Sequence, residues 1–414
     1  MTQAPSGRTR RKTWAGRDGV WLENDHCALF AQSAGAMTPL FAIKRDDALI
    51  NSQWVPHFRG APGAEFDAGR AADSAYWGAR LMFEAAGTFP CAPTFGSGEG
   101  LTPADAPPHG HTACGDWQLQ ASGELDGAAW AAWRLPASAP WPLSYRKWDL
   151  LGAQGAVHSL LLEVRNDGAV SQPVNLAWHT TLGEPLLCEG GLLSCSARKY
   201  AVPPTGSEFD TTGRLQRGAQ FTSLAGAPLA NGGTVDLRRH TLYCDRSDMV
   251  CAQMPPADSA QPGWGAFINP RLKLGFLTLA PRAGLADLAP AHFCNFWLHQ
   301  GGRHFVPWAD DAGGPDRCRA LGMEMAVGYF ANGLAASLKT PENLERPTYL
   351  MLAPGARVRF AVVNLLFTPA FDGELTALET SDRGLTIGNG GVSQHIDCDI
   401  ALSALNRLIA RSPQ

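Results

Sequence analysis

The chain has 414 residues, of which 45% are hydrophobic and 17% are charged, and its formal net charge is -4 at pH 7. This hydrophobic fraction is ample for the core of a globular protein. A slightly acidic chain with no basic, aromatic-rich patch beyond its start offers no electrostatic basis for binding nucleic acid. No segment approaches the roughly 20 apolar residues that a membrane helix needs. We therefore expect neither nucleic acid nor a membrane as a partner.

The N-terminal sequence MTQAPSGRTRRKTW is basic, and no apolar stretch follows it that would form the core of a signal peptide. We predict that residues 1–16 form a disordered basic tail and that the protein is not exported. The ten cysteines never form a C-x-x-C pair, and their spacing fits neither a zinc ribbon nor a small disulfide-rich domain. We therefore expect reduced thiols in a cytoplasmic protein.

Glycine and proline, at 45 and 30 residues, separate short apolar or alternating segments instead of long helical periods. That pattern predicts an all-β architecture with long loops. Large β-sandwiches often exceed the usual domain size, so we expect a single domain over residues 17–414. The predicted strands, in chain order, cover residues 20–23, 39–43, 117–120, 129–135, 145–151, 157–165, 174–180, 272–279, 293–298 and 357–367.

Two further segments have their own composition. Residues 52–110 are rich in Gly, Pro and Ala without clear alternation, which predicts long loops over one face of the sheet, where binding groups are commonly held. Near the C-terminus, apolar residues at helical spacing, with Asp397 and Asp399 early and Arg407 late, match an amphipathic helix whose charges complement its dipole. We predict a C-terminal helix over 396–410 that packs on the sandwich or mediates self-association.

The most informative stretch runs from residue 160 to residue 187. Its first half alternates in hydrophobicity, and the Asn-Asp-Gly sequence at 166–168 tolerates a tight turn, so the stretch reads as strand, turn, strand. In the second strand Leu176 and Trp178 share one face, so His179 lies on the other, because side chains alternate along a strand. We expect His179 to be presented on a polar face rather than buried.

This stretch, LLLEVRNDGAVSQPVNLAWHTTLGEPLL, resembles a segment of the aldose 1-epimerase (galactose mutarotase-like) family. HGHTACGDW, which begins at His109, and LGMEMAVGYF, which contains Glu324, resemble two further family segments in the expected order. WLENDHCALFAQSAGAMTPLFAIK and LMLAPGARVRFAVV are similar to the family's opening and closing strands. The resemblance spans roughly residues 19–367. It implies a large antiparallel β-sandwich, the galactose mutarotase-like supersandwich, with few short helices.

The resemblance also implies an isomerase that interconverts the α and β anomers of a sugar. That reaction moves one proton off the anomeric hydroxyl and another onto the ring oxygen, so a base and an acid suffice, each worth roughly 10²- to 10⁴-fold. No metal or organic cofactor is expected. By resemblance, Glu324 is the base, His179 is the acid that protonates the ring oxygen, and His109 hydrogen-bonds the sugar.

Sugar binding also requires flat apolar surfaces under the C–H faces and polar groups at the hydroxyls. Trp117, Trp297 and Gln300 are candidates for these contacts, and His111 competes with His109 for its role. His109 and His111 form an H-x-H pair, but no third ligand is clearly placed for a metal.

The segment GTFPCAPTFG at residues 87–96 resembles the family's branch that acts on phosphorylated sugars. The arginine that usually precedes it is absent, since Glu84, Ala85 and Ala86 stand there, and this departure argues against a sugar phosphate. Arg59 or Arg80 remains as a substitute from a nearby loop.

Each of these residues also has an ordinary structural interpretation, such as a solvated strand face for Glu324 or a backbone hydrogen bond for His179. Because one fold hosts many chemistries, function has to be argued from the site. Two alternatives stay open. One is an isomerase or lyase that abstracts a proton next to a carbonyl of an oxidised sugar, and the other is a non-catalytic carbohydrate-binding protein. The substrate and the oligomeric state, including a homo-oligomer, also stay open.

Overall fold

The computed structural model describes residues 7–67, 69, 80–205, 213–256, 258–259, 261–281, 284–381, 383–400 and 402–411. Strands dominate these residues, and the α-helices among them are four in number and five to nine residues long. The predicted all-β class with few short helices is confirmed. None of the described helices has the length and apolar character needed to cross a membrane. None of the ten cysteines, which all lie within the described residues, forms a disulfide bond.

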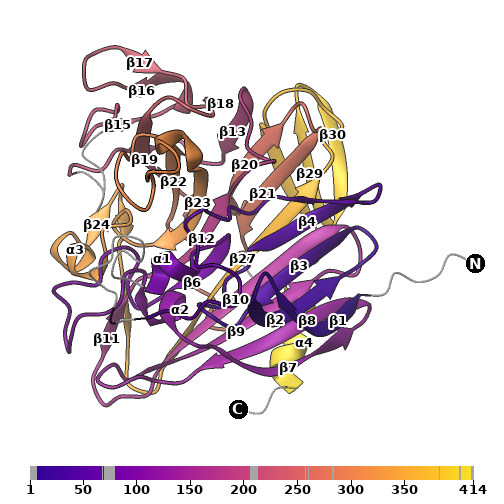
Figure 1. The fold of residues 1–414 in the computed structure, drawn as a ribbon, viewed down its shortest axis with the longest axis vertical. Coiled ribbons are helices and arrows are strands. Elements are labelled where there is room, and N and C mark those ends of the chain that lie inside the picture. The colour runs from indigo at the N-terminus through magenta and orange to yellow at the C-terminus, as the bar shows by residue number, and fades with distance from the viewer. Residues whose placement is uncertain are drawn as a thin grey trace, which may run out of the picture.

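Two large antiparallel sheets make up the sandwich (Figure 1). The nine-stranded sheet has the order β18 (Arg239–His240), β13 (Gly191–Cys195), β20 (Gly263–Asn269), β21 (Leu274–Ala280), β27 (Arg357–Phe367), β10 (Ala156–Asn166), β9 (Leu143–Leu151), β8 (Ala128–Leu135) and β7 (Gln118–Leu125). The seven-stranded sheet has the order β15 (Gln220–Phe221), β14 (Tyr200–Ala201), β19 (Arg246–Gln253), β22 (Phe293–Gln300), β23 (Arg319–Val327), β12 (Leu176–Leu182) and β6 (Thr88–Cys91).

Smaller elements surround these two sheets. The short strand pairs are β11 (Gln172–Val174) with β26 (Leu350–Leu352), β16 (Ala227–Pro228) with β17 (Thr234–Val235), and β24 (Glu342–Asn343) with β25 (Arg346–Pro347). The helices α1 (Arg80–Glu84), α2 (Gly110–Cys114) and α3 (Leu334–Lys339) lie in connections. Each of the ten predicted strands coincides with an observed one, while the sequence reading missed others, such as β19 and β20.

A five-stranded meander at the N-terminus corrects one prediction. It consists of β1 (Arg8–Trp14), β2 (Arg17–Glu23), β3 (Cys27–Gln32), β4 (Leu40–Arg45) and β5 (Ala48–Asn51). The predicted disordered tail over residues 1–16 is wrong for residues 8–14, which pair with β2 along their whole length. Their basic side chains have partners on β2, because Arg10 donates to Glu23 at 3.0 Å and Lys12 lies over the ring of Trp21. Residues 1–6 lie outside the described residues.

The C-terminal segment corrects a second prediction. Residues 392–397 form β30 (Val392–Asp397), which joins β28 (Ala377–Ser381) and β29 (Gly384–Asn389) in a three-stranded sheet. The predicted helix over 396–410 is therefore wrong in its first turns, and α4 spans Ser403–Arg411. The carboxylate of Asp399 explains this start, because it accepts the backbone N–H groups of Ser403 and Ala404 and so caps the helix there.

Together the three-stranded sheet and α4 cover the outer face of the nine-stranded sheet, in one hydrophobic cluster that includes Leu161, Val363, Leu385 and Leu405. The prediction that the C-terminal helix packs on the sandwich is confirmed.

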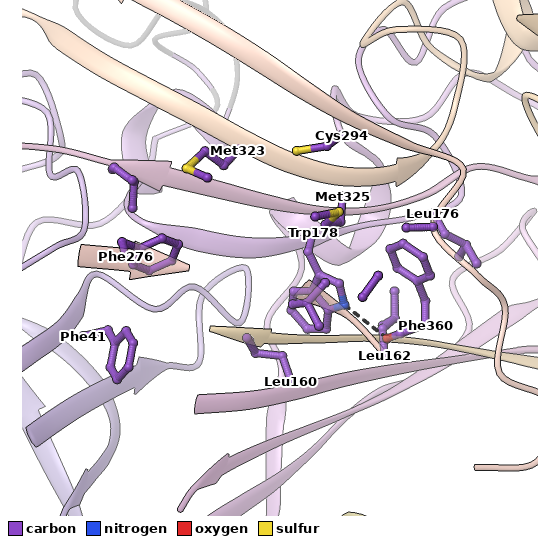
Figure 2. Packing of buried hydrophobic residues seen from close by; sticks show 14 of the residues in the cluster. Phe41, Leu160, Leu162, Leu176, Trp178, Phe276, Cys294, Met323, Met325 and Phe360 are labelled. Carbon is purple, nitrogen blue, oxygen red and sulfur yellow. Dashed lines mark hydrogen bonds between the residues drawn. The ribbon is translucent and has the colours of Figure 1, made fainter. Parts of the chain in front are cut away.

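The main core lies between the two large sheets (Figure 2). Trp178 and Met325 of the seven-stranded sheet point towards Leu162 and Phe360 of the nine-stranded sheet, and Trp178 Nε1 donates to the Phe360 carbonyl at 3.1 Å. The predicted alternation in residues 174–180 is therefore confirmed, since Trp178 faces this core.

The turn after β10 does not form a hairpin, because β10 pairs with β9 and β27 whereas β12 belongs to the other sheet. The side chain of Asn166 donates to the carbonyls of Val170 and Leu352, both at 2.8 Å, and so fixes the chain where it crosses between sheets.

A charged cluster is buried within the core, on the nine-stranded sheet. Lys147 Nζ lies 2.9 Å from Asp149 Oδ1, and His158 Nε2 lies 3.0 Å from the same oxygen. Trp133 donates to the other carboxylate oxygen, and Lys147 also donates to the Ala36 carbonyl in the meander. Lys147, Asp149 and His158 are 0% exposed, so this cluster ties the meander to the sandwich through charges that water does not reach.

Candidate active site

A cavity of about 600 Å³ lies on the face of the seven-stranded sheet that points away from the main core. Four residues singled out from the sequence line it: His109, His179, Trp297 and Glu324. Much of the remaining wall comes from residues 54–108. The expectation that loops within 52–110 lie over one face of the sheet and carry binding groups is therefore supported by their position.

Strand register brings His179 and Glu324 together. On β12 His179 pairs with Phe89 of β6, and on the next strand, β23, Glu324 pairs with Asn295 of β22. The order β22, β23, β12, β6 thus sets these four residues in one row across the sheet. His179 Nε2 lies 3.1 Å from Glu324 Oε1, which is hydrogen-bond distance.

The Glu324 carboxyl is 1% exposed, and burial raises its pKa to about 8 because a carboxylate is poorly solvated there. Its second oxygen, Oε2, has no hydrogen-bond partner among the described residues. Gly322, two residues earlier on the same face, leaves room for this carboxyl, since a Cβ there would lie 2.7 Å from Oε1. A pKa raised to this range favours the protonated form of the carboxyl at neutral pH.

His179 is buried, with a side chain 11% exposed, so the expectation of an exposed histidine is wrong. Its ring stacks on Phe89 with centroids 4.5 Å apart, and its Nδ1 lies 2.8 Å from Thr181 Oγ1. Burial, and then the neighbouring His109, hold the pKa of His179 well below its usual value. The loops over this face bury the histidine, and no pattern within its own strand encodes them.

His109 precedes α2 in a left-handed backbone conformation, with φ 59°, and its ring lies perpendicular to His179 with centroids 4.9 Å apart. Its Nδ1 accepts the Gly96 N–H at 3.3 Å, so the neutral ring carries its proton on Nε2. Burial lowers the pKa of His109 to about 4, which keeps it a neutral donor. The backbone at Gly110 passes close to Ala92, because a Cβ at position 110 would lie 2.1 Å from the Ala92 carbonyl oxygen.

The other half of the cavity is aromatic. The ring of Trp54 lies edge-on to Trp297 at 5.8 Å and parallel to Trp308 at 6.2 Å. The guanidinium of Arg303 lies 4.3 Å from the Trp308 ring centroid and 5.2 Å from that of Trp297. The sequence reading selected Trp297 and missed Trp54, Trp308 and Arg303. The 13 tryptophans of the chain indicated that aromatic residues are available for a sugar site, but their number does not predict which of them line the cavity and which lie in the core.

Four predicted contact residues are not among the described residues that line the cavity. Trp117 is 2% exposed in the main core, where its Nε1 donates to the Thr112 carbonyl. Gln300 is buried and donates to the Thr241 carbonyl, and Arg80 pairs with Asp116. His111 lies beside the ring of Trp141. The sugar contacts expected of these four residues stay a prediction. Among the described residues there is no cluster suited to a metal ion.

No family model matches the sequence, and no curated protein matches it. Solved structures do match. A galactose mutarotase-like protein from Clostridium acetobutylicum superposes with a TM-score of 0.54 over 88% of this chain and 99% of its own, at 9% identity. The chain has the galactose mutarotase-like fold.

Two further structures agree. A candidate aldose 1-epimerase from Klebsiella pneumoniae has a TM-score of 0.58 over 87% of this chain and 83% of its own, at 12% identity. A protein from Synechocystis sp. PCC 6803 has a TM-score of 0.53 over 89% of this chain and 99% of its own, at 14% identity. At such identities a galactose mutarotase-like fold leaves the chemistry to be argued from the cavity.

Proposed function

We propose that this protein is an aldose 1-epimerase-like isomerase that interconverts sugar anomers by acid–base ring opening. The observation that carries the proposal is the direct contact between Glu324 and His179 inside an aromatic-walled cavity. The galactose mutarotase-like fold supports it, because solved proteins of this fold are described as aldose 1-epimerase candidates.

The closeness of the two groups suits this reaction. The anomeric hydroxyl oxygen and the ring oxygen are both bonded to the anomeric carbon, so the base and the acid that serve them must be near neighbours. Glu324 Oε1 and His179 Nε2, 3.1 Å apart on adjacent strands, meet that requirement.

Over one catalytic cycle, Glu324 and His179 together take up as many protons as they release. Transfer of the Glu324 proton to His179 gives a carboxylate and an imidazolium. The carboxylate takes the anomeric hydroxyl proton while the imidazolium protonates the ring oxygen, the bond between that oxygen and the anomeric carbon breaks, and the pair is neutral again. After rotation about the C1–C2 bond, Glu324 returns a proton to the carbonyl oxygen and His179 removes one from the ring hydroxyl. Burial favours the neutral pair, which is the form that ring closure requires.

The remaining walls have supporting roles in this proposal. His109, neutral with its proton on Nε2, donates to a sugar hydroxyl. Trp297 and Trp308, which line the cavity, supply apolar surface for the C–H groups of the sugar.

The first test is anomer exchange by the wild-type protein, measured by polarimetry or exchange NMR with a panel of free hexoses and pentoses. We expect acceleration with at least one sugar and its loss in His179→Asn, which removes the acid. No acceleration by the wild type across the panel contradicts the proposal. Solvent deuterium appearing at a carbon-bound position would instead favour an isomerase or lyase acting on an oxidised sugar. Saturable sugar binding with neither result would favour a binding protein.

The pH profile is a second expected outcome. The active pair holds one proton, which it loses as the pH rises through the Glu324 pKa of about 8. We therefore expect kcat/KM to fall about tenfold per pH unit above pH 8. As the pH falls, His179 takes up a second proton only well below the usual pKa of a histidine, because burial lowers its pKa. Activity should therefore persist at mildly acidic pH. Rates that rise steadily above pH 8 would contradict a one-proton pair.

A further inference from the structure

Asn295 occupies the position next to Glu324 on the side away from His179. It lies on β22, directly opposite Glu324 of β23. Directly opposed residues of an antiparallel pair project from the same face, with Cβ atoms about 4.5–5.5 Å apart. The Asn295 amide and the Glu324 carboxyl therefore lie within the combined reach of their side chains.

Each of the two side chains has polar atoms without a hydrogen-bond partner among the described residues. Asn295 is 0% exposed, and neither its Nδ2 nor its Oδ1 has a partner among the described residues. The same holds for Glu324 Oε2. Buried polar groups rarely stay unpaired, since an unpaired one costs about 1–3 kcal/mol. On the other side of Asn295, the thiol of Cys251 already accepts a hydrogen bond from the Asn343 amide at 3.6 Å. Glu324 is therefore the neighbour whose carboxyl oxygen, Oε2, can still form a hydrogen bond with the Asn295 amide.

We propose that Asn295 is a positioning residue that hydrogen-bonds Glu324 Oε2 in both protonation states of the catalytic cycle. An amide suits this role because its Nδ2–H donates to a carboxylate, whereas its Oδ1 accepts from the O–H of a carboxylic acid. Rotation of the amide exchanges the two arrangements without adding charge. Oε1 then stays directed at His179 and the sugar. The inference rests on the proposed function, because the cycle described above is what alternates the two states.

Other titratable groups face this corner of the cavity. His179 of β12 and His109 face Glu324 and are neutral at rest, with their pKa values lowered by burial. The thiols of Cys91 on β6 and Cys251 on β19 are also near, and Cys294 lies on the core-facing side of β22. Burial raises the pKa values of all three thiols above the usual range, so they do not ionise near pH 8. A change in the basic limb of the rate profile on altering Asn295 is therefore a change at the Glu324–His179 pair.

The test compares Asn295→Leu and Asn295→Asp, both close to the wild-type side chain in size, with the wild type. We expect kcat to fall about tenfold or more with little change in KM, because Asn295 does not touch the sugar. The basic limb should move up by about one pH unit in Asn295→Leu, because the bond to the charged carboxylate that this variant loses is stronger than the bond to the neutral acid. It should move further in Asn295→Asp, which adds a like charge. Folded variants with wild-type kcat and an unmoved limb would overturn the proposal.

Asn364 of β27 offers a matched control. It is also buried, and neither of its amide atoms has a partner in the described part of the chain. It faces His158 and Thr278 in the nine-stranded sheet, away from the cavity. Asn364→Leu should alter stability without moving the basic limb, and an equal shift in this variant would contradict a specific role for Asn295.

A measurement on the wild type needs neither a variant nor activity. In protein labelled with ¹⁵N-asparagine and ¹³C-glutamate, the side-chain amide of Asn295 should titrate with the same midpoint as the Glu324 carboxyl. An amide signal that stays constant through the titration of Glu324 overturns the proposal. If no sugar is turned over but the two signals titrate together, the proposed function fails while the contact between Asn295 and Glu324 stands.

Discussion

Glu324→Gln is expected to slow anomer exchange by roughly 10²- to 10⁴-fold, because an amide cannot take the proton of the anomeric hydroxyl. The substitution is nearly isosteric, and the glutamine can still hydrogen-bond His179 across the 3.1 Å contact. It also removes a buried carboxyl whose pKa of about 8 shows that its charged form is disfavoured there. The fold should therefore survive, with a thermal midpoint close to that of the wild type.

The rate would be measured by polarimetry of a freshly dissolved single anomer, at a pH on the plateau of the wild-type profile. Glu379→Gln is the matched control, since it makes the same chemical change on an exposed strand position of β28 in the sheet on the outer side of the sandwich. It should leave the rate unchanged. A folded Glu324→Gln protein with wild-type exchange would remove Glu324 from the mechanism.

Asp149→Ala is expected to lower the free energy of unfolding by about 3–5 kcal/mol. Lys147 is 0% exposed and loses its carboxylate partner, so a charge would be left in the core with the Ala36 carbonyl as its remaining hydrogen-bond acceptor among the described residues. Trp133 and His158 lose their acceptor as well. Denaturant unfolding monitored by tryptophan fluorescence measures the change.

Two comparisons make this result specific. Asp287 pairs with Arg357 at the surface, where both side chains are 43% exposed, and Asp287→Ala should cost less than about 1 kcal/mol. Replacing the pair together, as Lys147→Met with Asp149→Leu, should recover much of the loss, because no unpaired charge remains. An Asp149→Ala protein as stable as the wild type would show that water reaches Lys147.

The errors of the sequence reading share a cause. The segment at residues 8–14 looked like a basic tail because the groups that neutralise it, Glu23 and the ring of Trp21, lie on a partner strand. The start of the C-terminal helix was misplaced because pairing of Ile396 with Leu385 on β29 overrides a helical pattern. In each case a contact distant in sequence outweighed a correct local signal. The division into domains stays a prediction.

The sequence by itself determined ten of the extended segments, and on which face of its strand a residue such as His179 lies, because alternation is a local property of the backbone. The motifs also pointed to Glu324 and His109. Only the tertiary structure decided that His179 is buried, that it touches Glu324, and that Trp54 and Trp308 wall the cavity. Burial depends on loops laid over the sheet, and contact depends on the register between strands far apart in the chain. The pattern of residues within a single strand therefore predicts neither the burial of a side chain nor its contacts.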